Sequence, residues 1–346
     1  MTATAPNAQP IAQPIDLSII IVNWNVRDLL RQCLASVWQQ GGLPAERLQV
    51  IVVDNDSHDG SAEMVAREFP AAELIANRDN LGFGRANNQA LPLCRGRYVM
   101  LLNPDTLVLE GAPEEAPGRP KLPRPPRGAG GAQPSPGGAL RAMVEHMDAH
   151  PDVHVTGCRL LNGDGTLQRW TGGAYPRLLN VLNHYFFVDR LLPAKMRPMP
   201  LYLDHDAQQD FEVDWVSGAV MLLRADRLNG QLFNPDYFMY GEDMELCHRL
   251  KQAGGRVVYT PCASIIHYQG ESMKQQQGDV LLSALKGPRQ FYRQMRGEKA
   301  VWLYDLITVG GFGLRWLLYR IKGQPAQEKA RSSHDLMLRA WRIMKA

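Results

Sequence analysis

The sequence predicts an α/β protein whose mostly parallel sheet has helices on both faces. Short apolar runs alternate with helix-like stretches, which is the pattern of repeated βαβ units. The chain is also long and apolar enough for a large core, with 346 residues of which 45% are hydrophobic and 21% charged. In such sheets, ligands bind at the carboxyl ends of the strands. Candidate functional residues should therefore follow the predicted strands.

The alternation is most regular in the first hundred residues. Each predicted strand is a short apolar run bounded by turn-forming residues, which indicates a strand buried on both faces. The strands are expected at 17–22, 49–54, 72–76 and 98–102, and the helices at 27–39, 60–68 and 84–93.

A second series of elements follows residue 138. The pattern predicts a helix at 140–149, a strand at 153–161 and an apolar segment at 213–223. A further helix should begin near Glu242, because acidic residues occupy its first turn and basic residues its end, as the helix dipole favours. A glycine pair at 254–255 should end this helix before a strand at 256–259. Residues 16–280 are therefore assigned to one α/β domain.

Two segments do not fit the α/β pattern. Residues 1–15 have neither the basic n-region nor the apolar h-region of a signal peptide and are expected to form a disordered leader. Residues 111–138 contain 8 Pro and 7 Gly among 28 residues, so a disordered surface insertion is expected. A Pro-rich segment that binds a partner protein and a frameshifted stretch are the alternatives for this insertion.

Residues 281–346 are predicted to form a basic, amphipathic helical tail. From residue 286 onward there are 13 Lys/Arg and 4 Asp/Glu, a net charge of +9, which favours an anionic surface as partner. The run 301–320 is aromatic and apolar but includes Asp305, Arg315 and three glycines. A helix lying on an anionic membrane is therefore preferred to a spanning helix, and packing on the domain or on a second subunit is the alternative. Nucleic acid is not expected to bind, because the charges interleave with a long apolar stretch.

The cysteines indicate the compartment. Their number is odd and no CxxC spacing occurs among Cys33, Cys94, Cys158, Cys247 and Cys262. This pattern supports neither a disulfide framework nor a zinc cluster and fits a reducing cytoplasm. We expect a cytoplasmic protein that is peripheral at the inner face of the cell membrane.

The tetrapeptide 103–106 follows the predicted strand 98–102 and is the first candidate for chemistry. Its Asp105 offers a hard oxygen ligand at a strand end, where Mg²⁺ or Mn²⁺ could bind. His267 ends a later apolar run and could supply an imidazole ligand, although a lone histidine is more simply a hydrogen-bonded core or loop residue. Asn103 stands where a second acid would strengthen the site. We expect Asp105 and His267 to bind a divalent cation.

The acidic pair Glu242-Asp243 begins a predicted helix after an aromatic loop at 237–241. Attack by a hydroxyl group on an activated carbon is slow unless a positioned carboxylate removes its proton, and a helix start can hold such a base rigidly. We predict that Asp243 is this base. Capping of the helix is the simpler interpretation if the pair is considered alone.

Further candidates follow the first three strands. Asp54 ends a strand and can accept a hydrogen bond from a nucleobase N–H or a ribose hydroxyl, whereas Ser57 and Asp59 more simply cap the next helix. The run 82–84 lacks the third glycine of GxGxxG and does not predict a dinucleotide site. The residues expected to bind a nucleotide-containing donor substrate are Asn23, Asn25, Asp54, Asn80, Gly82, Arg85, Asn88, Asn103 and Asp105.

Together these motifs resemble the family 2 glycosyltransferases of GT-A fold, and within that family the bacterial rhamnosyltransferase type. The resemblance covers residues 17–270 and is interrupted by the insertion. Any one motif is weak, but five in this order with sensible spacing are specific. They lie at 19–25, 52–60, 80–83, 102–106 and 241–249.

The resemblance implies an inverting, metal-dependent transfer of a sugar such as rhamnose. The implied donor is a dTDP- or UDP-sugar, and the acceptor is a hydroxyl of a glycan or lipid-linked glycan in bacterial surface polysaccharide or cell-wall assembly. Asp105 would match the last acid of the family's DxD metal motif, His267 a downstream histidine that contacts the metal, Asp243 the base, and Asp54 the residue that reads the nucleobase. The implied sugar pocket contains Trp215, Ser217, Gly218 and Glu242.

The sequence alone leaves two other classes of function open. A catalytically inactive carbohydrate-binding or scaffold protein would leave the coexistence of Asp105, Asp243 and His267 without a reason. A metal-dependent nucleotidyltransferase would be expected to have a Gly-rich phosphate loop with a basic residue near the first strand. This chain has the uncharged residues 23–25 there instead.

Overall fold

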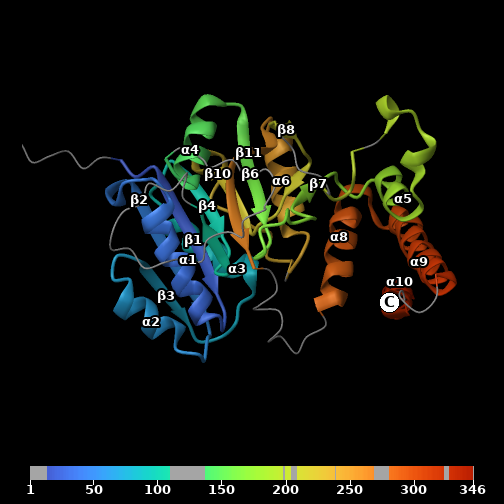
Figure 1. Cartoon of the computed structure of the whole chain (residues 1–346), viewed down its shortest axis with the longest axis horizontal. Coiled ribbons are helices and arrows are strands. Elements are labelled where there is room, and N and C mark those ends of the chain that lie inside the picture. The colour runs from blue at the N-terminus through green and yellow to red at the C-terminus, as the bar shows by residue number, and fades with distance from the viewer. Residues whose placement is uncertain are drawn as a thin grey trace, which may run out of the picture.

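The computed structural model describes residues 14–109, 137–197, 199–203, 209–237, 239–268, 280–322 and 327–345. The predicted insertion lies outside the described residues except for Gly137 and Gly138, and so does the predicted leader except for Pro14 and Ile15. Figure 1 shows an α/β body built on one sheet and, beside it, a group of helices that contains the C-terminal end of the chain.

The sheet of the body has a parallel half and a mixed half. Its strands are β1 (Leu17–Asn23), β2 (Leu48–Asn55), β3 (Glu73–Asn77), β4 (Tyr98–Leu102), β5 (Thr106–Val108), β6 (Val153–Leu161), β8 (Phe211–Glu212), β10 (Val220–Arg224) and β11 (Arg256–His267). The order is β3-β2-β1-β4-β10-β6-β11-β5, with β8 beside β11. β3, β2, β1 and β4 are parallel, as the sequence pattern predicts. β10 is antiparallel to β4 and β6, and β5 is antiparallel to β11.

Helices cover both faces of this sheet (Figure 1). Those of the body are α1 (Arg27–Gln40), α2 (Ser61–Glu68), α3 (Phe83–Ala90), α4 (Ala139–Ala149) and α6 (Glu242–Gln252). Because successive side chains of a strand point to opposite faces, Ile19 and Ile21 enter one core and Ile20 the other. α1, α2 and α4 complete the first core, and α3 and α6 the second. Burial on both faces accounts for the continuous apolar runs.

The structure divides one predicted segment and extends another. Residues 213–223 contain β9 (Trp215–Val216) and most of β10, which are joined by a turn at Gly218 and Ala219. β9 pairs with β7 (Gly172–Gly173) in a separate small sheet. The strand expected at 256–259 continues to His267, with a register shift between Thr260 and Ser264. This irregularity surrounds Pro261, which has no N–H to donate to the ladder.

Three helices form the predicted basic tail, α8 (Val280–Arg296), α9 (Glu298–Ile321) and α10 (Gln327–Lys345). They share an apolar core with α5 (Leu178–Phe186), to which Tyr185, Tyr292, Tyr304 and Phe312 contribute. The Arg289 guanidinium binds both carboxylate oxygens of buried Asp305 at 2.8 and 2.9 Å, which ties α8 to α9. The tail is thus a packed helical unit.

α9 is apolar on a buried face and on an exposed one. Among the described residues it is the helix whose length and composition would allow it to cross a membrane, but 39% of its apolar window is buried inside the protein. Val301, Tyr304 and Ile307 lie on the buried face, whereas Trp302 and Leu303 are exposed. Packing on the protein, the alternative to an interfacial helix, therefore accounts for one face only.

Candidate active site

A cavity of about 620 Å³ lies at the carboxyl edge of the parallel strands and extends to the helical tail. Residues from the ends of β1, β2 and β4 meet the start of α6 and the end of β11 in its wall. α5, α8, α9 and α10 contribute the opposite part of the lining. Ten of the predicted site residues line it, namely Asn80, Gly82, Asn103, Asp105, Trp215, Ser217, Gly218, Glu242, Asp243 and His267.

The turn at 103–106 is held by two strands. The Asn103 N–H donates to the Ala219 carbonyl at 2.9 Å, and the Thr106 hydroxyl closes the turn onto the Asn103 carbonyl at 2.7 Å. On the other side, β5 pairs antiparallel with β11 so that Thr106 lies opposite His267. This register brings the side chains of Asp105 and His267 together although they are far apart in the chain.

Asp105 and His267 form a nearly buried pair. Asp105 Oδ1 lies 3.3 Å from His267 Nε2, and the Asn103 amide nitrogen is also 3.3 Å from that nitrogen. Two neighbouring ligands of one octahedral cation, each at about 2.1 Å, are separated by about 3 Å. The spacing of the carboxylate oxygen and the imidazole nitrogen therefore fits a shared divalent cation.

Gln168, which no sequence motif indicates, orients His267. Its side-chain oxygen accepts a hydrogen bond from His267 Nδ1 at 2.8 Å, and its amide nitrogen donates to the His267 carbonyl at 3.1 Å. Nδ1 therefore carries the proton, and the lone pair of Nε2 faces Asp105 and Asn103. No motif surrounds Gln168, so only its position against β11 identifies it.

A second group of potential metal ligands lies elsewhere in the fold. His146, His150 and Asp210 place one ligand atom each within 4.8 Å of one another. His146 and His150 are on α4 and its C-cap, which lead to the amino end of β6, whereas His267 is at the carboxyl end of the parallel strand β11. This group is thus at the opposite edge of the sheet and does not share a cation with Asp105.

Asp243 lies at the start of α6, as expected for the acidic pair. Gly241 precedes the helix with φ 86°, a left-handed conformation that glycine adopts without strain. The Met244 N–H donates to Asp243 Oδ1 at 2.8 Å, and the Gly218 N–H also binds this carboxylate. Burial is the main cause that raises the pKa of Asp243, with these N–H groups opposing it.

Glu242 is more deeply buried than its neighbour. It is 7% exposed, and its Oε2 has no hydrogen-bond partner among the described residues. Burial and the charge of Asp243 raise the pKa of Glu242, which favours its neutral form. The pair can therefore hold one negative charge at Asp243, which is the form required of a base.

Aromatic rings form the wall beside Asp243. Trp215 donates its indole N–H to the Ala174 carbonyl at 3.1 Å, which fixes the ring of this predicted pocket residue. Tyr202 crosses Trp215 nearly at right angles with ring centroids 6.0 Å apart, and His184 packs on Tyr202 at 5.3 Å. Such rings are suited to stacking on the apolar faces of sugars. Tyr202 and His184 were not predicted because they belong to no motif.

Arg315 is the one Lys or Arg among the described residues that line this cavity. It donates to the His184 carbonyl at 2.8 Å, and its guanidinium carbon lies 5.0 Å from the centre of the Tyr185 ring. Burial, with the charge of Arg315, lowers the pKa of His184 to about 4, so this imidazole is neutral. The tail thus contributes one fixed cation to the cavity.

The predicted donor residues after β1 and β2 form an internal network and do not line the cavity. Asp54 accepts from the Asn23 side chain and from the Ser57 N–H, both at 3.0 Å, and is 3% exposed. Asn25 accepts from the His58 N–H at 2.7 Å. The neighbouring Asn55 lines the cavity instead. Contact of Asn23, Asn25 and Asp54 with a donor stays a prediction.

Two other predicted donor residues lie outside the cavity wall. Asn88 accepts from the backbone N–H groups of Leu232 and Phe233 and donates to the Phe233 carbonyl at 2.6 Å. Its amide is thus used to hold the loop before α6. Arg85 is exposed on α3 and does not line the cavity. By contrast, Asn80 lies at the wall and accepts from the Gly82 N–H at 2.9 Å.

The model for glycosyl transferase family 2 matches residues 18–116. This span contains β1 to β5 and therefore includes Asp54 and Asp105 but not Asp243 or His267.

Curated relatives extend the similarity over most of the chain. An N-acetylglucosaminyl-diphospho-decaprenol L-rhamnosyltransferase of Mycobacterium tuberculosis is 27% identical over 272 residues, covering 74% of this chain and 77% of that protein. Rhamnosyltransferase WbbL of Escherichia coli is 24% identical over 260 residues, covering 72% and 82%.

Among solved structures, the mannosyltransferase PcManGT from Pyrobaculum calidifontis, in complex with GDP-Man and Mn²⁺, has a similar fold. The TM-score is 0.54 at 15% sequence identity, with 95% of this chain and 88% of that chain covered.

Proposed function

The chain belongs to the family 2 glycosyltransferases and has their GT-A fold, and from that premise we propose an inverting transfer of a sugar from a nucleotide donor to a lipid-linked glycan. One observation carries the proposal. A single cavity contains the Asp105–His267 pair on one side and the carboxylate of Asp243 on another. A direct displacement needs both a group that stabilises the leaving diphosphate and a base for the attacking hydroxyl.

The cofactor proposed for this site is a divalent cation held by Asp105 Oδ1 and His267 Nε2. When bound, such a cation supplies electrostatic stabilisation of the diphosphate leaving group. The mixed oxygen and nitrogen donors support Mn²⁺ over Mg²⁺, which prefers oxygen ligands. PcManGT, which shares the fold, was solved with Mn²⁺.

The base proposed for the acceptor hydroxyl is Asp243. Two backbone N–H groups hold its carboxylate, so the oxygen that receives the proton is positioned before the acceptor arrives. Its raised pKa brings proton affinity closer to that needed at neutral pH. Attack from the side of Asp243, opposite to the departing nucleotide, would invert the configuration of the anomeric carbon.

We propose rhamnose as the donated sugar, carried by dTDP, with a UDP-hexose as the alternative. Support comes from the two relatives named rhamnosyltransferases. The cavity is largely apolar near Trp24, Phe83 and Met239, which suits a 6-deoxy sugar whose methyl group needs no hydrogen bond. Asn55 and Asn80 supply polar groups at the edge nearest β2.

We propose a polyprenyl-diphosphate-linked glycan as the acceptor. The cavity runs from Asp243 past the aromatic wall to Arg315, and a guanidinium is a good partner for a diphosphate. The name of the M. tuberculosis relative includes such a diphospho-lipid. The exposed apolar face of α9 supports a peripheral position at the cytoplasmic face of the membrane.

The test is nucleotide release from a panel of nucleotide sugars, with and without Mn²⁺. Release is expected with at least one donor, and excess chelator should abolish it. Asp243→Asn should lower turnover by about 10² to 10⁴-fold while nucleotide binding persists. Asp236→Asn, at an exposed acid of the preceding loop, should leave turnover unchanged. Near-normal turnover of Asp243→Asn would remove Asp243 as the base, and full activity in chelator would refute the metal.

A further inference from the structure

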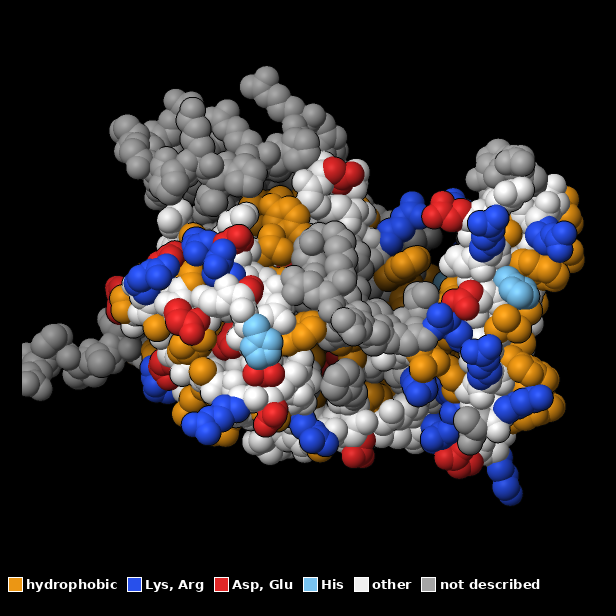
Figure 2. All heavy atoms as spheres, turned by 90° about the horizontal axis from the view of Figure 1, so that it is seen from below, with side chains coloured by type: hydrophobic (Ala, Val, Ile, Leu, Met, Phe, Trp, Pro, Cys, Tyr) orange, Lys and Arg blue, Asp and Glu red, His pale blue; other side chains and the backbone are white. Residues whose placement is uncertain are grey.

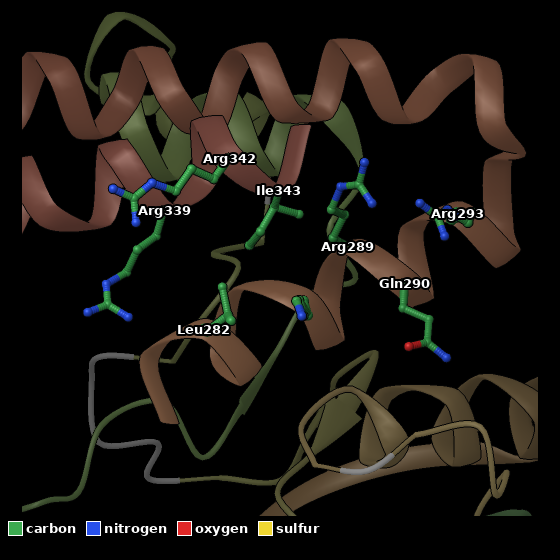
Figure 3. A pocket seen from close by; sticks show the side chains of 8 residues that line it. Leu282, Arg289, Gln290, Arg293, Arg339, Arg342 and Ile343 are labelled. Carbon is green, nitrogen blue, oxygen red and sulfur yellow. The ribbon is translucent and has the colours of Figure 1, made fainter. Parts of the chain in front are cut away.

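A second cavity lies between α8 and α10, away from the catalytic residues. It has a volume of about 530 Å³. Figure 3 shows that α8 contributes Leu282, Arg289, Gln290 and Arg293 to its lining, and that α10 contributes Arg339, Arg342 and Ile343. Lys286 of α8 completes it. We call this cavity the basic cleft.

The basic cleft has more cations than anions. Arg289 binds Asp305, Arg293 binds Glu298 at 3.0 Å and Arg339 binds Asp335 at 2.6 Å. Lys286 and Arg342 are exposed and have no acidic partner within the described part of the chain. Two positive charges therefore face the cleft without compensation. Arginine and lysine arranged in this way favour a phosphate group.

Apolar side chains accompany these charges on the surface of the helical unit. Trp341 is 41% exposed one residue before Arg342, and Lys345 lies over its ring at 4.8 Å. On α9, Trp302 is 62% exposed and Leu303 is also exposed. Figure 2 shows Lys and Arg side chains interspersed with hydrophobic ones over the helical part of the molecule. Exposed Trp and Leu beside cations are typical of a surface that lies on anionic lipid.

The basic cleft and the active-site cavity lie on different sides of α8. Lys286 and Arg289 face the cleft, whereas Leu285 and Pro288 line the active-site cavity. A helix with its side chains is about 10 Å across. The basic cleft is therefore separate from the cavity in which the acceptor diphosphate is proposed to contact Arg315.

We propose that the basic cleft binds the phosphate of an anionic phospholipid headgroup and so docks the enzyme on the membrane. Lys286 and Arg342 supply the uncompensated charge, and the neighbouring Trp341 inserts at the interface. This inference rests on the membrane location proposed above and specifies the residues responsible for it.

The test is co-sedimentation of the full chain with vesicles of phosphatidylglycerol and phosphatidylcholine. Lys286→Gln/Arg342→Gln should weaken partitioning by about 30-fold, since each basic side chain near an anionic surface adds roughly a factor of five. The matched control is Lys322→Gln/Lys329→Gln, which removes the same charge from exposed positions. Residue 329 lies about 20 Å along α10 from Arg342. The control variant should lose much less vesicle binding.

Three results would overturn the proposal. The first is equal loss in both double variants, which would mean general electrostatic attraction without a site. The second is no binding of the unmodified chain to anionic vesicles. The third is thermal stabilisation by inorganic phosphate that requires Lys286 and Arg342 while vesicle binding does not, which would assign the cleft to a free phosphate compound.

A further variant distinguishes the loss of charge from a folding defect. The exchange Lys286→Arg/Arg342→Lys keeps both charges and should keep vesicle binding. If this exchange also loses binding while its melting temperature is unchanged, charge at the cleft is not the cause and the proposal fails. Vesicle binding requires no sugar transfer, so its outcome is independent of the nucleotide-release assay.

Discussion

Gln168 Oε1 lies 2.8 Å from His267 Nδ1, and this contact decides which imidazole nitrogen faces Asp105. The amide oxygen can only accept, so Nδ1 donates and Nε2 is left as a ligand atom. Partners of this kind tune metal sites as strongly as many direct ligands do.

We predict that Gln168→Ala weakens Mn²⁺ affinity by about 10- to 100-fold, because His267 loses the acceptor that fixes its tautomer. Gln168→Glu keeps an acceptor oxygen at this position and should retain most of the affinity. The measurement is the Mn²⁺ concentration that gives half-maximal nucleotide release. The same Mn²⁺ dependence in the unmodified protein and both variants would show that Gln168 does not position His267 for the metal.

The pH dependence of turnover should report the ionisation of Asp243. Burial raises its pKa to about 6, and a base must be ionised, so kcat/KM should fall as the pH decreases through that value. An exposed aspartate would give a limb near pH 4. Glu242→Gln removes the ionisable group next to Asp243 and should retain the acid limb of the kcat/KM profile. An acid limb below pH 5 would show that Asp243 does not control the reaction.

We predict that Asp54→Ala raises the donor KM. Its carboxylate joins the Asn23 side chain to the Ser57 N–H in the internal network at the ends of β1 and β2, and loss of both bonds should also destabilise the fold by about 1–3 kcal/mol. Asp54→Asn keeps one acceptor and should have a smaller effect. Isothermal titration with the nucleotide measures the change, and unchanged donor binding would place the nucleobase elsewhere.

Arg315→Ala should raise the KM for a diphosphate-linked acceptor by about 10- to 100-fold, as expected when a charged hydrogen bond is lost. The KM for the nucleotide sugar should not change, because Arg315 belongs to the tail side of the cavity. Arg315→Lys keeps the charge and should recover part of the effect. Steady-state kinetics with acceptors that have or lack the diphosphate make the comparison. An equal effect on both acceptors would contradict the assignment.

The sequence alone identifies the candidates whose position follows from a local pattern. Asp105 follows the buried strand β4, and Asp243 follows a glycine at the start of α6, so apolar runs and turn residues are sufficient to find them. The parallel half of the sheet was predictable for the same reason. The antiparallel direction of β10 was not, because an apolar run buried on both faces has the same composition in either direction.

The sequence therefore determined the α/β class, the strand-end acids and the basic charge of the tail. Only the tertiary structure decided the partners that come from distant segments. Gln168 contacts His267 because the loop after β6 packs on β11, and Arg315 enters the cavity because α9 packs on α5. The tertiary structure likewise showed that Asn88 holds the loop before α6, and that two tail helices place Lys286 and Arg342 around one cleft. These relationships depend on contacts between segments that no local pattern encodes.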